Sequence, residues 1–502
     1  MAETATAERQ QGTETGETTQ VDVLIIGAGV SGIGAAHHLR EKFPDRSFLL
    51  LDAQDHIGGT WWAHRFPGIR SDSDLFTYGY RHKPWRGPSI ATAEEILNYL
   101  DETVEEEDLT DKIRFQQRVT SLEWSSADSM WTAHVTREDT GEQLRYRANF
   151  LWMCQGYYNF DEPYQPTWEG MDRYEGLIVH PEQWPDGVEY ADKKVLIIGS
   201  GATMATVAPE MAKTAEHVTV LQRSPSFYAA RPVVHELAQT LAPLDLPPEW
   251  THEILRRQYI LESDFITNMC FENPDEAREY LLDGIRDLVP EGTDLDKDFT
   301  PKYRPWQQRI VRVPDGDFFE RMRAGKLSVV TDTIDEFVEK GVQISSGEVL
   351  EADIIVTATG FNMSTFGDIP FEVDGAPVDW TKHVTWRGLM INDIPNMAYS
   401  FGYFRHSWTL RIDLINDLMA RVFTHMQERG ATVVVPTLRP QDKDMPLLPW
   451  VDSDNISSGY MMRALDRLYK QGDRDPWVHL YEYDHEAKTL PTIDIEDGLE
   501  YR

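Results

Sequence analysis

Two glycine-rich turns carry the residues whose spacing indicates chemistry most clearly. The first reads Gly27-x-Gly29-x-x-Gly32, and an acid, Asp52, follows 20 residues after the last glycine. In such a turn the first glycine allows the tight bend, the second lets backbone N–H groups reach a pyrophosphate, and the third lets helix and strand pack closely. A carboxylate at the place of Asp52 accepts hydrogen bonds from a ribose. The spacing predicts a dinucleotide site, with an ordinary glycine turn as the alternative.

The second turn, Gly199-x-Gly201-x-x-Met204, departs from the pattern because methionine stands at its third position. We therefore expect its helix to pack differently from the first one, or slightly further from its strand. The strand that follows leads to Arg223 and Ser224 and carries no acid. A carboxylate there would repel a 2′-phosphate, whereas an arginine and a hydroxyl would bind it. We expect NADPH at this turn and FAD at the first, while a plain surface charge is the alternative for Arg223.

Both turns lie within the same succession of strand, turn, helix and strand. The first unit consists of the apolar run Val21–Ile26, the helix-compatible stretch Ser31–Lys42 and the apolar run Ser47–Leu51. Two units of this kind predict an α/β fold with two Rossmann-like dinucleotide-binding domains. The second unit repeats the pattern in Val195–Ile198, Ala202–Lys213 and Val218–Leu221.

Further elements are expected between and after these units. Glu123–Trp131 and Trp131–Val135 have the composition of antiparallel strands, and Asp353–Thr359 has that of a buried strand. The stretch 235–300 is rich in Glu, Leu and Arg, which predicts a helical insertion.

The charge of the chain is strongly acidic. The 502 residues contain 84 acids and 48 bases, for a net charge of −36. Such a surface repels nucleic acid and anionic membranes, so we expect neither as a partner. The excess of acids fits an ordinary soluble acidic enzyme, or adaptation to high salt, where screening relieves self-repulsion.

Cysteine content and the chain's first residues indicate the compartment. Cys154 and Cys270 form no C-x-x-C motif, which excludes a disulfide framework and favours a reducing cytoplasm. No stretch approaches the roughly 18 apolar residues of a membrane span. Residues 1–20 lack an apolar core, so we expect a disordered acidic tail and no signal peptide.

Two longer stretches go beyond a generic nucleotide fold. Gly58–Asp72 fits [AG]-G-x-W-x(4)-[FY]-P-[GM]-x(3)-D, and Tyr174–Pro185 fits F-x-G-x(3)-H-x(3)-W-P with tyrosine at its first position. Together they resemble the two fingerprints of type I Baeyer–Villiger monooxygenases, and the resemblance extends from Val21 to about Gln471. FPGIRSDSD, GYYNFDEPY, IIGSGAT and LQRSPS are most similar to the subgroup of ethionamide-activating monooxygenases.

The resemblance implies an enzyme that uses NADPH, FAD and O₂. Reduced flavin captures O₂ as a C4a-peroxide, which converts ketones to esters or lactones and sulfides to sulfoxides. A fixed cation beside that peroxide is expected, and the resemblance assigns it to Arg309, with Asp72 holding the arginine by a charge-assisted hydrogen bond. His180 would act through domain movement and cofactor positioning. The further cofactor-binding residues that it implies are Gly59, Thr60, Trp61, Trp184, Thr203 and Gln308, the last standing where many relatives have lysine.

The same comparison sets the expected domains. An FAD-binding domain of residues 21–162 and 361–502 is interrupted by an NADPH-binding domain of residues 163–234 and 301–360, which carries the helical insertion. The expected substrate is a small ketone or sulfide, with no metal and no protein partner inferred.

Alternative functions remain open. The first is a flavin monooxygenase confined to sulfur or nitrogen oxidation, although Trp184-Pro185 favours the Baeyer–Villiger type. A flavin disulfide reductase would need a redox cysteine pair, and a binding or sensing role would leave both fingerprints unexplained. Trp62, Trp386 and Trp408 are candidates for the substrate pocket, with core packing as the alternative.

Overall fold

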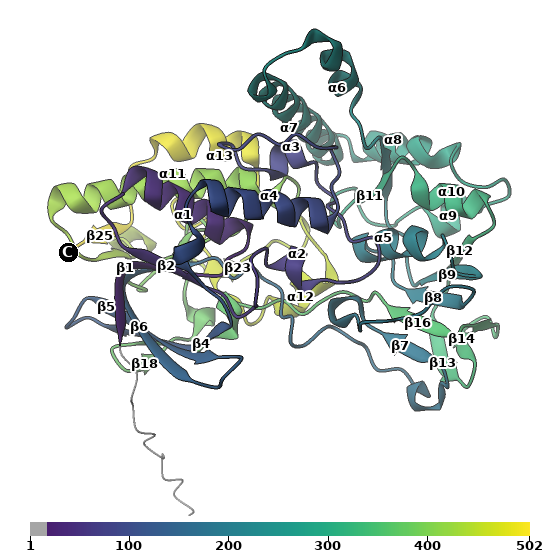
Figure 1. Ribbon diagram of the computed structural model, residues 1–502, viewed down its shortest axis with the longest axis horizontal. Helices are drawn as coiled ribbons and strands as arrows, with labels where there is room; N and C mark the ends of the chain where they lie inside the picture. Colours follow the sequence, from purple (N-terminus) through teal and green to yellow (C-terminus); the bar gives the residue numbers. More distant parts are fainter. Residues whose placement is uncertain (1–17) are drawn as a thin grey trace, which may run out of the picture.

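The structure, a computed structural model, describes residues 18–502, so most of the predicted tail lies outside the described residues. The described part contains two α/β units, each built on its own sheet (Figure 1). This confirms the predicted α/β class and the two Rossmann-like units. The first strand, β1 (Thr19–Ile26), begins two residues before its predicted start.

The first sheet has nine strands, in the order β18-β17-β4-β5-β6-β1-β2-β3, with β21 paired to β6. Strand β1 runs parallel to both of its neighbours, and its side chains alternate between two cores. Val23 and Ile25 pack with helices α1 (Val30–Lys42) and α11 (Trp408–Arg429), while Leu24 and Ile26 pack on the opposite face. The other strands are β2 (Phe48–Leu51), β3 (Ile113–Arg114), β4 (Gln117–Ser125), β5 (Met130–Arg137), β6 (Gln143–Met153), β17 (Phe371–Val373), β18 (Ala376–Pro377) and β21 (Met397–Tyr399).

The predicted boundary between the antiparallel strands at Trp131 is wrong. The chain turns at residues 126–129, between β4 and β5, and Trp131 lies within β5 opposite Trp124. Ser129 has a φ of +53°, and the turn sequence Ser-Ala-Asp-Ser consists mainly of residues that favour turns. Trp124 and Trp131 flank this turn, and tryptophan is favoured in strands, so composition did not locate the turn.

The second sheet is entirely parallel, in the order β12-β9-β8-β16-β7. Its helix α5 (Ala202–Met211) follows β8, as the second glycine turn predicts. The strands are β7 (Leu177–Val179), β8 (Lys194–Ile198), β9 (His217–Gln222), β12 (Leu327–Thr331) and β16 (Ile354–Thr357). Strand β7 precedes the second glycine turn in the chain but lies at the edge of the sheet, next to β16.

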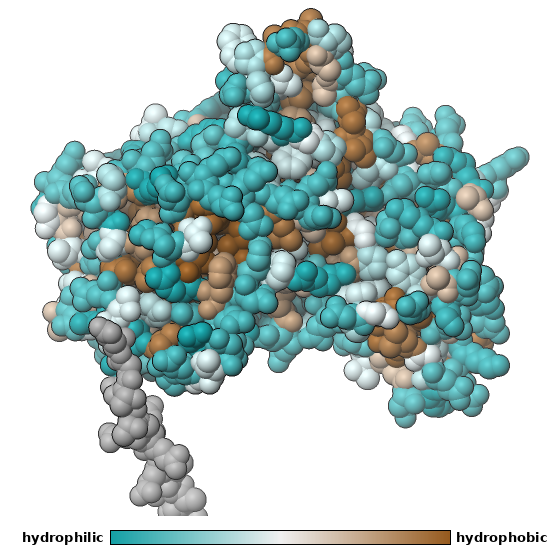
Figure 2. All heavy atoms as spheres, viewed as in Figure 1, coloured by the Kyte–Doolittle hydropathy of each residue, from teal (hydrophilic) through white to brown (hydrophobic). Residues whose placement is uncertain are grey.

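Residues 235–300 form helices α6 (Glu236–Leu241), α7 (Pro248–Glu272), α8 (Pro274–Arg286) and α9 (Leu295–Asp298). They connect the paired strands β10 (Tyr228–Arg231) and β11 (Val311–Pro314). Helices α6 and α7 rise above the rest of the molecule in Figure 1. Apolar side chains are exposed on α7, among them Trp250 and Phe265, and brown residues appear at the top of Figure 2 on an otherwise mainly hydrophilic face.

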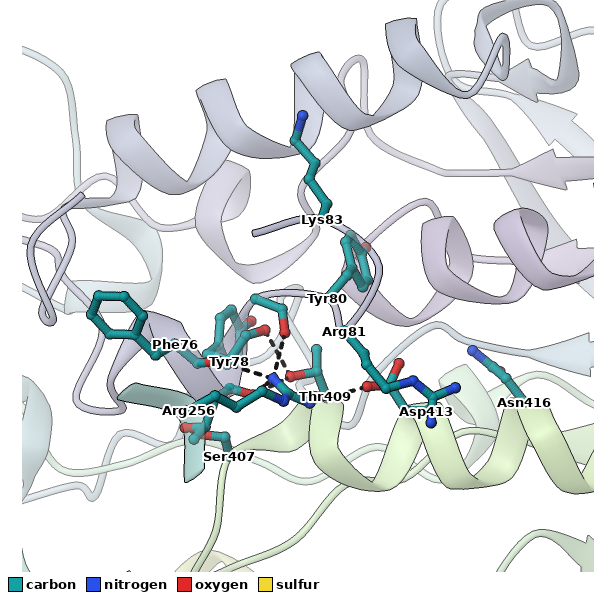
Figure 3. Close-up of polar contacts among 12 residues, drawn as sticks. Phe76, Tyr78, Tyr80, Arg81, Lys83, Arg256, Ser407, Thr409, Asp413 and Asn416 are labelled. Atoms are coloured by element: carbon teal, nitrogen blue, oxygen red, sulfur yellow. Dashed lines mark hydrogen bonds and ion pairs between the residues drawn. The ribbon is translucent and has the colours of Figure 1, made fainter. Parts of the chain in front are cut away.

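One arginine ties α7 to the first unit. Arg256 donates from Nη1 to the carbonyl oxygens of Phe76 at 2.9 Å and Gly79 at 3.2 Å, and from Nη2 to Asp413 at 3.2 Å (Figure 3). The two carbonyls belong to the C-terminal end of the short helix α3 (Leu75–Tyr78), where they have no helical partner. Arg256 thus fixes α3, which begins three residues after Asp72.

Candidate functional site

The first glycine turn is closed by its acid. Asp52 Oδ2 accepts a hydrogen bond from the Ala28 N–H at 2.7 Å, and its Oδ1 accepts one from the Gln54 N–H at 2.9 Å. Gly27 has a φ of +105°, which favours glycine, and a Cβ on Gly32 would lie 1.9 Å from the Gly27 oxygen. The first turn therefore requires glycine for its bend and for the contact between helix and strand.

The second turn also requires glycine at its first position but carries methionine at its third. Gly199 has a φ of +145°, and a Cβ there would lie 2.2 Å from the Ala358 oxygen. Met204 is fully buried in the core between α5 and the second sheet, so the third position is filled by a large side chain, as the departure from glycine predicts. Arg223 and Ser224, directly after β9, are exposed. Among the described residues no acid forms an ion pair with Arg223.

A single cavity of about 1730 Å³ joins the two turns. Gly29 and Gly59 both line this cavity and approach each other closely, since a Cβ on Gly59 would lie 3.4 Å from the Gly29 Cα. The sequence-predicted residues that line the cavity are Gly27, Gly29, Asp52, Gly59, Thr60, Trp61, Asp72, His180, Gly199, Gly201, Thr203, Arg223, Ser224, Gln308 and Arg309.

Two residues predicted to bind a cofactor, Gly32 and Trp184, do not line the cavity. Gly32 is buried beneath the first turn, where it serves the contact between helix and strand. Trp184 packs against the core of the second unit. Of the three tryptophans considered for a pocket, Trp386 is fully buried in the core, Trp62 stacks on His56, and Trp408 lines the cavity.

Asp72 and Arg309 meet although 237 positions separate them. Arg309 Nε lies 2.7 Å from Asp72 Oδ2, and its Nη2 lies 2.9 Å from Oδ1, which makes a two-point, charge-assisted contact. Burial alone would raise the pKa of Asp72, but the charges of Arg309 and Arg312 hold it below its ordinary value. The Asp72 charge in turn raises the pKa of Arg309. The guanidinium of Arg309 therefore stays charged, and the two-point contact with Asp72 fixes its orientation.

The second fingerprint places two titratable groups on the cavity wall. His180 Nδ1 accepts a hydrogen bond from the Glu182 N–H at 3.2 Å, and burial lowers the pKa of the imidazole. Both carboxyl oxygens of Glu182 are buried without a hydrogen-bond partner, and burial raises its pKa to about 8. Near neutral pH, the Glu182 carboxyl is therefore mainly protonated. The sequence analysis did not predict that Glu182 lines the cavity.

Aromatic rings form part of the wall of the large cavity, and of those described next only Trp408 had been considered for a pocket from the sequence. Tyr157 stacks on Trp408 with ring centroids 5.4 Å apart, and Phe361 lies between Tyr158 and Tyr460 at 4.3 and 4.2 Å. All five rings line the large cavity, and flat ring systems pack well on such surfaces. The adjacent tyrosines 157 and 158 were the available signal.

A second cavity of about 540 Å³ adjoins the first. Helix α7, strands β10 and β11 and residues 404–407 contribute to its wall. The residues common to both cavities are Asp72, Ser73, Arg309, Phe404 and His406. The ion pair therefore stands where the two cavities meet.

The described residues contain one cluster with metal-ligand composition, made of His37, His82 and Glu107. The two imidazoles stack at 3.5 Å with nearly parallel planes, so one ion cannot lie in the plane of both rings. Glu107 also pairs with Arg40 at 2.8 Å. We assign no metal to it. No helix among the described residues has the length and apolar character to cross a membrane.

Comparison with known proteins gives consistent matches. A family model described as flavin-binding monooxygenase-like matches residues 80–239, and one for an NAD(P)-binding Rossmann-like domain matches residues 25–89. The chain is 43% identical over 462 residues to the FAD-containing monooxygenase EthA of Mycolicibacterium smegmatis, with 92% of both chains covered. It is 39% identical over 482 residues to the probable FAD-binding monooxygenase AlmA of Acinetobacter baylyi, with 95% of both covered.

Solved structures share the fold at lower identity. An oxidized steroid monooxygenase bound to NADP superposes with a TM-score of 0.74 at 23% identity, covering 96% of this chain and 99% of that chain. The open crystal structure of cyclohexanone monooxygenase gives a TM-score of 0.73 at 22% identity, covering 96% of this chain and 100% of that chain. The arrangement of both units is thus shared with these enzymes.

Proposed function

The chain belongs to the type I Baeyer–Villiger monooxygenases, near its EthA relatives, and we propose that it uses NADPH and O₂ to convert ketones to esters or lactones and sulfides to sulfoxides. It is an FAD-dependent oxidoreductase of this type. The observation that carries the finer proposal is the position of the Asp72–Arg309 pair. Both residues line the large cavity and the adjoining smaller one.

We assign one cofactor to each glycine turn. FAD would lie along Gly27, Gly29 and the Gly59–Trp61 segment, with Asp52 toward its ribose, because these residues line the large cavity and surround the first turn. NADPH would lie along Gly199 and Gly201 of the second turn, which line the same cavity. Its 2′-phosphate would be bound by Arg223 and Ser224, and the assignment extends to Thr203 and Gln308 on the same wall.

The role of Arg309 follows from charge. When bound and reduced, FAD supplies the oxygen atom that it takes from O₂. The guanidinium of Arg309 would stabilise negative charge that develops on the reacting oxygens, and Asp72 would keep its orientation through the two-point contact. Asp72 would in this sense be a positioning residue, whereas Arg309 would face the reacting atoms. His180 would act through domain movement and cofactor positioning, and Trp184 would contribute to cofactor binding.

The two cysteines do not support the alternative function of a flavin disulfide reductase. Cys154 and Cys270 are both free and buried, and burial raises the pKa of each thiol to about 12, which disfavours the thiolate that a disulfide reductase needs. Oxidation confined to sulfur or nitrogen is an outcome of the test below.

Product analysis tests the proposal. The FAD-loaded enzyme is given NADPH, O₂ and either one methyl ketone or one aryl sulfide, and the products are identified by mass spectrometry. Ester from the ketone together with sulfoxide from the sulfide is the expected result. Sulfoxide without ester would instead restrict the enzyme to heteroatom oxidation.

A further inference from the structure

Strand β11 places a second arginine in the smaller cavity. Val311 and Val313 pack into the core of the second unit. Because side chains alternate along a strand, the residues between and beside these two valines point the other way. The residues of this segment that line the cavity of about 540 Å³ are Ile310, Arg312 and Pro314. Arg312 therefore shares the cavity with Arg309, which lies three positions earlier in the chain.

The guanidinium of Arg312 is open to this cavity. Its side chain is half-buried, and its nitrogen atoms keep accessible surface. In the part of the chain that the structure describes, no group accepts a hydrogen bond from these nitrogens or forms an ion pair with them. The charged residues that act on Arg312 from a longer distance all line the same cavity: Asp72, Asp74, Arg231 and Arg309. The N–H donors of Arg312 can therefore meet a ligand that enters the cavity.

The charges near Arg312 balance one another. Asp72 makes its two-point contact with Arg309. Asp74 accepts hydrogen bonds from the Thr77 N–H at 2.8 Å and from the Thr77 hydroxyl at 2.7 Å, as an ionised carboxylate does. Burial raises the pKa of Asp74, while these hydrogen bonds and the charge of Arg312 act against that rise. Two carboxylates thus accompany two guanidinium groups, and the unused donors favour an acceptor without net charge.

A ketone has such an acceptor at its reacting carbon. Its carbonyl oxygen gains negative charge as oxygen transfer begins, and a cation that contacts this oxygen accelerates the reaction. A sulfide has no oxygen at the corresponding position. Arg309 lies where the two cavities meet, whereas Arg312 lines the smaller cavity and is absent from the wall of the larger one. We propose that Arg312 donates a hydrogen bond to the carbonyl oxygen of a ketone substrate and so favours ketones over sulfides.

This inference rests on the proposed function, because it names a contact made by one of the two proposed substrate classes. A ketone, O₂, NADPH and H⁺ give the ester, H₂O and NADP⁺. One oxygen atom enters the bond between the carbonyl carbon and its neighbour, and the other leaves as water. Arg312 stays protonated throughout, since it donates a hydrogen bond and transfers no proton. Oxidation of a sulfide consumes the same O₂, NADPH and H⁺ but has no use for this donor.

Turnover of two matched substrates measures the preference. Benzylacetone and methyl phenethyl sulfide have the same skeleton and differ by the exchange of the carbonyl group for sulfur. Arg312→Met should lower kcat/KM for ester formation by roughly 10- to 150-fold, the range for a hydrogen bond to a charged group, and leave kcat/KM for sulfoxide formation near that of the wild type. Arg312→Lys keeps the charge without the planar fork of donors, so its selective loss should be smaller.

Arg231→Met is the matched control. Arg231 lines the same cavity but lies 3.9 Å from Glu262, so its charge already has a partner. Both kcat/KM values should stay near those of the wild type. Retained sulfoxide formation shows that Arg312→Met is folded, and Arg312→Lys supplies the same comparisons if Arg312→Met fails to bind FAD.

Infrared spectroscopy tests the contact without turnover. Benzylacetone labelled with ¹³C at its carbonyl group is added to the oxidised, FAD-loaded enzyme in the absence of NADPH. Isotope-edited difference spectra then record the C=O stretch of the bound ketone. Because a hydrogen bond weakens the C=O bond, the stretch should lie at lower frequency in the wild type than in Arg312→Met.

The outcomes separate this inference from the proposed function. Equal C=O frequencies in the wild type and Arg312→Met would overturn the inference. So would an equal loss of ester and sulfoxide formation in that variant, or no loss of either. A wild-type enzyme that shows the infrared difference but forms no ester would keep the contact and reject the proposed function.

Discussion

The two glycine turns share a backbone bend at their first glycine but differ in the residues around it. In the first, Gly32 allows a contact in which a Cβ would lie 1.9 Å from a backbone oxygen, and Asp52 hydrogen-bonds the turn itself. In the second, Met204 fills the corresponding space, and the acid is replaced by the exposed Arg223. The bend at the first glycine is thus the shared requirement, whereas the third residue of the motif and the residue after the next strand differ between the two turns.

The largest expected effect comes from placing alanine at the third position of each turn. Gly32→Ala should yield protein without bound FAD, because the added carbon has no space beneath the turn. Met204→Ala should retain FAD and lose about 2–5 kcal/mol of stability, as expected for truncation of a buried methionine. Flavin absorbance per protein and thermal melting measure both effects. Full FAD occupancy in Gly32→Ala would show that the close contact is not required.

A second prediction concerns the Asp72–Arg309 pair, which lies where the two cavities meet. Arg309→Ala should lower oxygen transfer by about a hundred- to a thousand-fold, because it removes the cation that stabilises developing charge. It should still bind FAD and still oxidise some NADPH, with release of hydrogen peroxide. Asp72→Ala should show a milder form of this uncoupling, and the double variant should be little worse than Arg309→Ala, as for residues that act as one unit. Normal product per NADPH in Arg309→Ala would identify the wrong arginine.

A third prediction sharpens the cofactor assignment. Arg223→Ala should raise the KM for NADPH by roughly 10- to 150-fold and leave the KM for NADH nearly unchanged, since only NADPH carries the 2′-phosphate. Steady-state kinetics with both cofactors measure the difference. Equal losses with NADPH and NADH would mean that Arg223 does not read the phosphate.

The smallest expected effect concerns Glu182, between the two turns in the chain. Its folded pKa of about 8 lies above the ordinary 4.5, so the ionisation of Glu182 costs no stability below pH 4.5, and the free energy of unfolding falls as pH rises from 4.5 through 8. Glu182→Gln should therefore melt near the wild type at pH 5 and a few degrees above it at pH 9. Glu175→Gln, an exposed neighbour, serves as the control and should show no such trend. Parallel melting curves at every pH would contradict the burial argument.

The parts of the site that the sequence predicts are those set by local spacing. Both turns, Asp52 and Arg223 follow from a strand, a bend and a helix in succession. The approach of Asp72 to Arg309 depends on packing between distant segments, and only family resemblance indicated it. The burial of the Glu182 carboxyl depends on side chains from several elements, which no spacing encodes. The turn at residues 126–129 was missed because the flanking tryptophans are compatible with continuous strand.

Isotope labelling tests the central claim, that the enzyme transfers one oxygen atom from O₂ to its substrate. The FAD-loaded wild type is given NADPH, a methyl ketone and ¹⁸O₂ in unlabelled water, and the ester is analysed by mass spectrometry. The account predicts one ¹⁸O per ester molecule and, in parallel, loss of labelled ester with retained NADPH oxidation in Arg309→Ala. An ester without ¹⁸O, or NADPH oxidation that yields only hydrogen peroxide in the wild type with every ketone and sulfide tried, would contradict it.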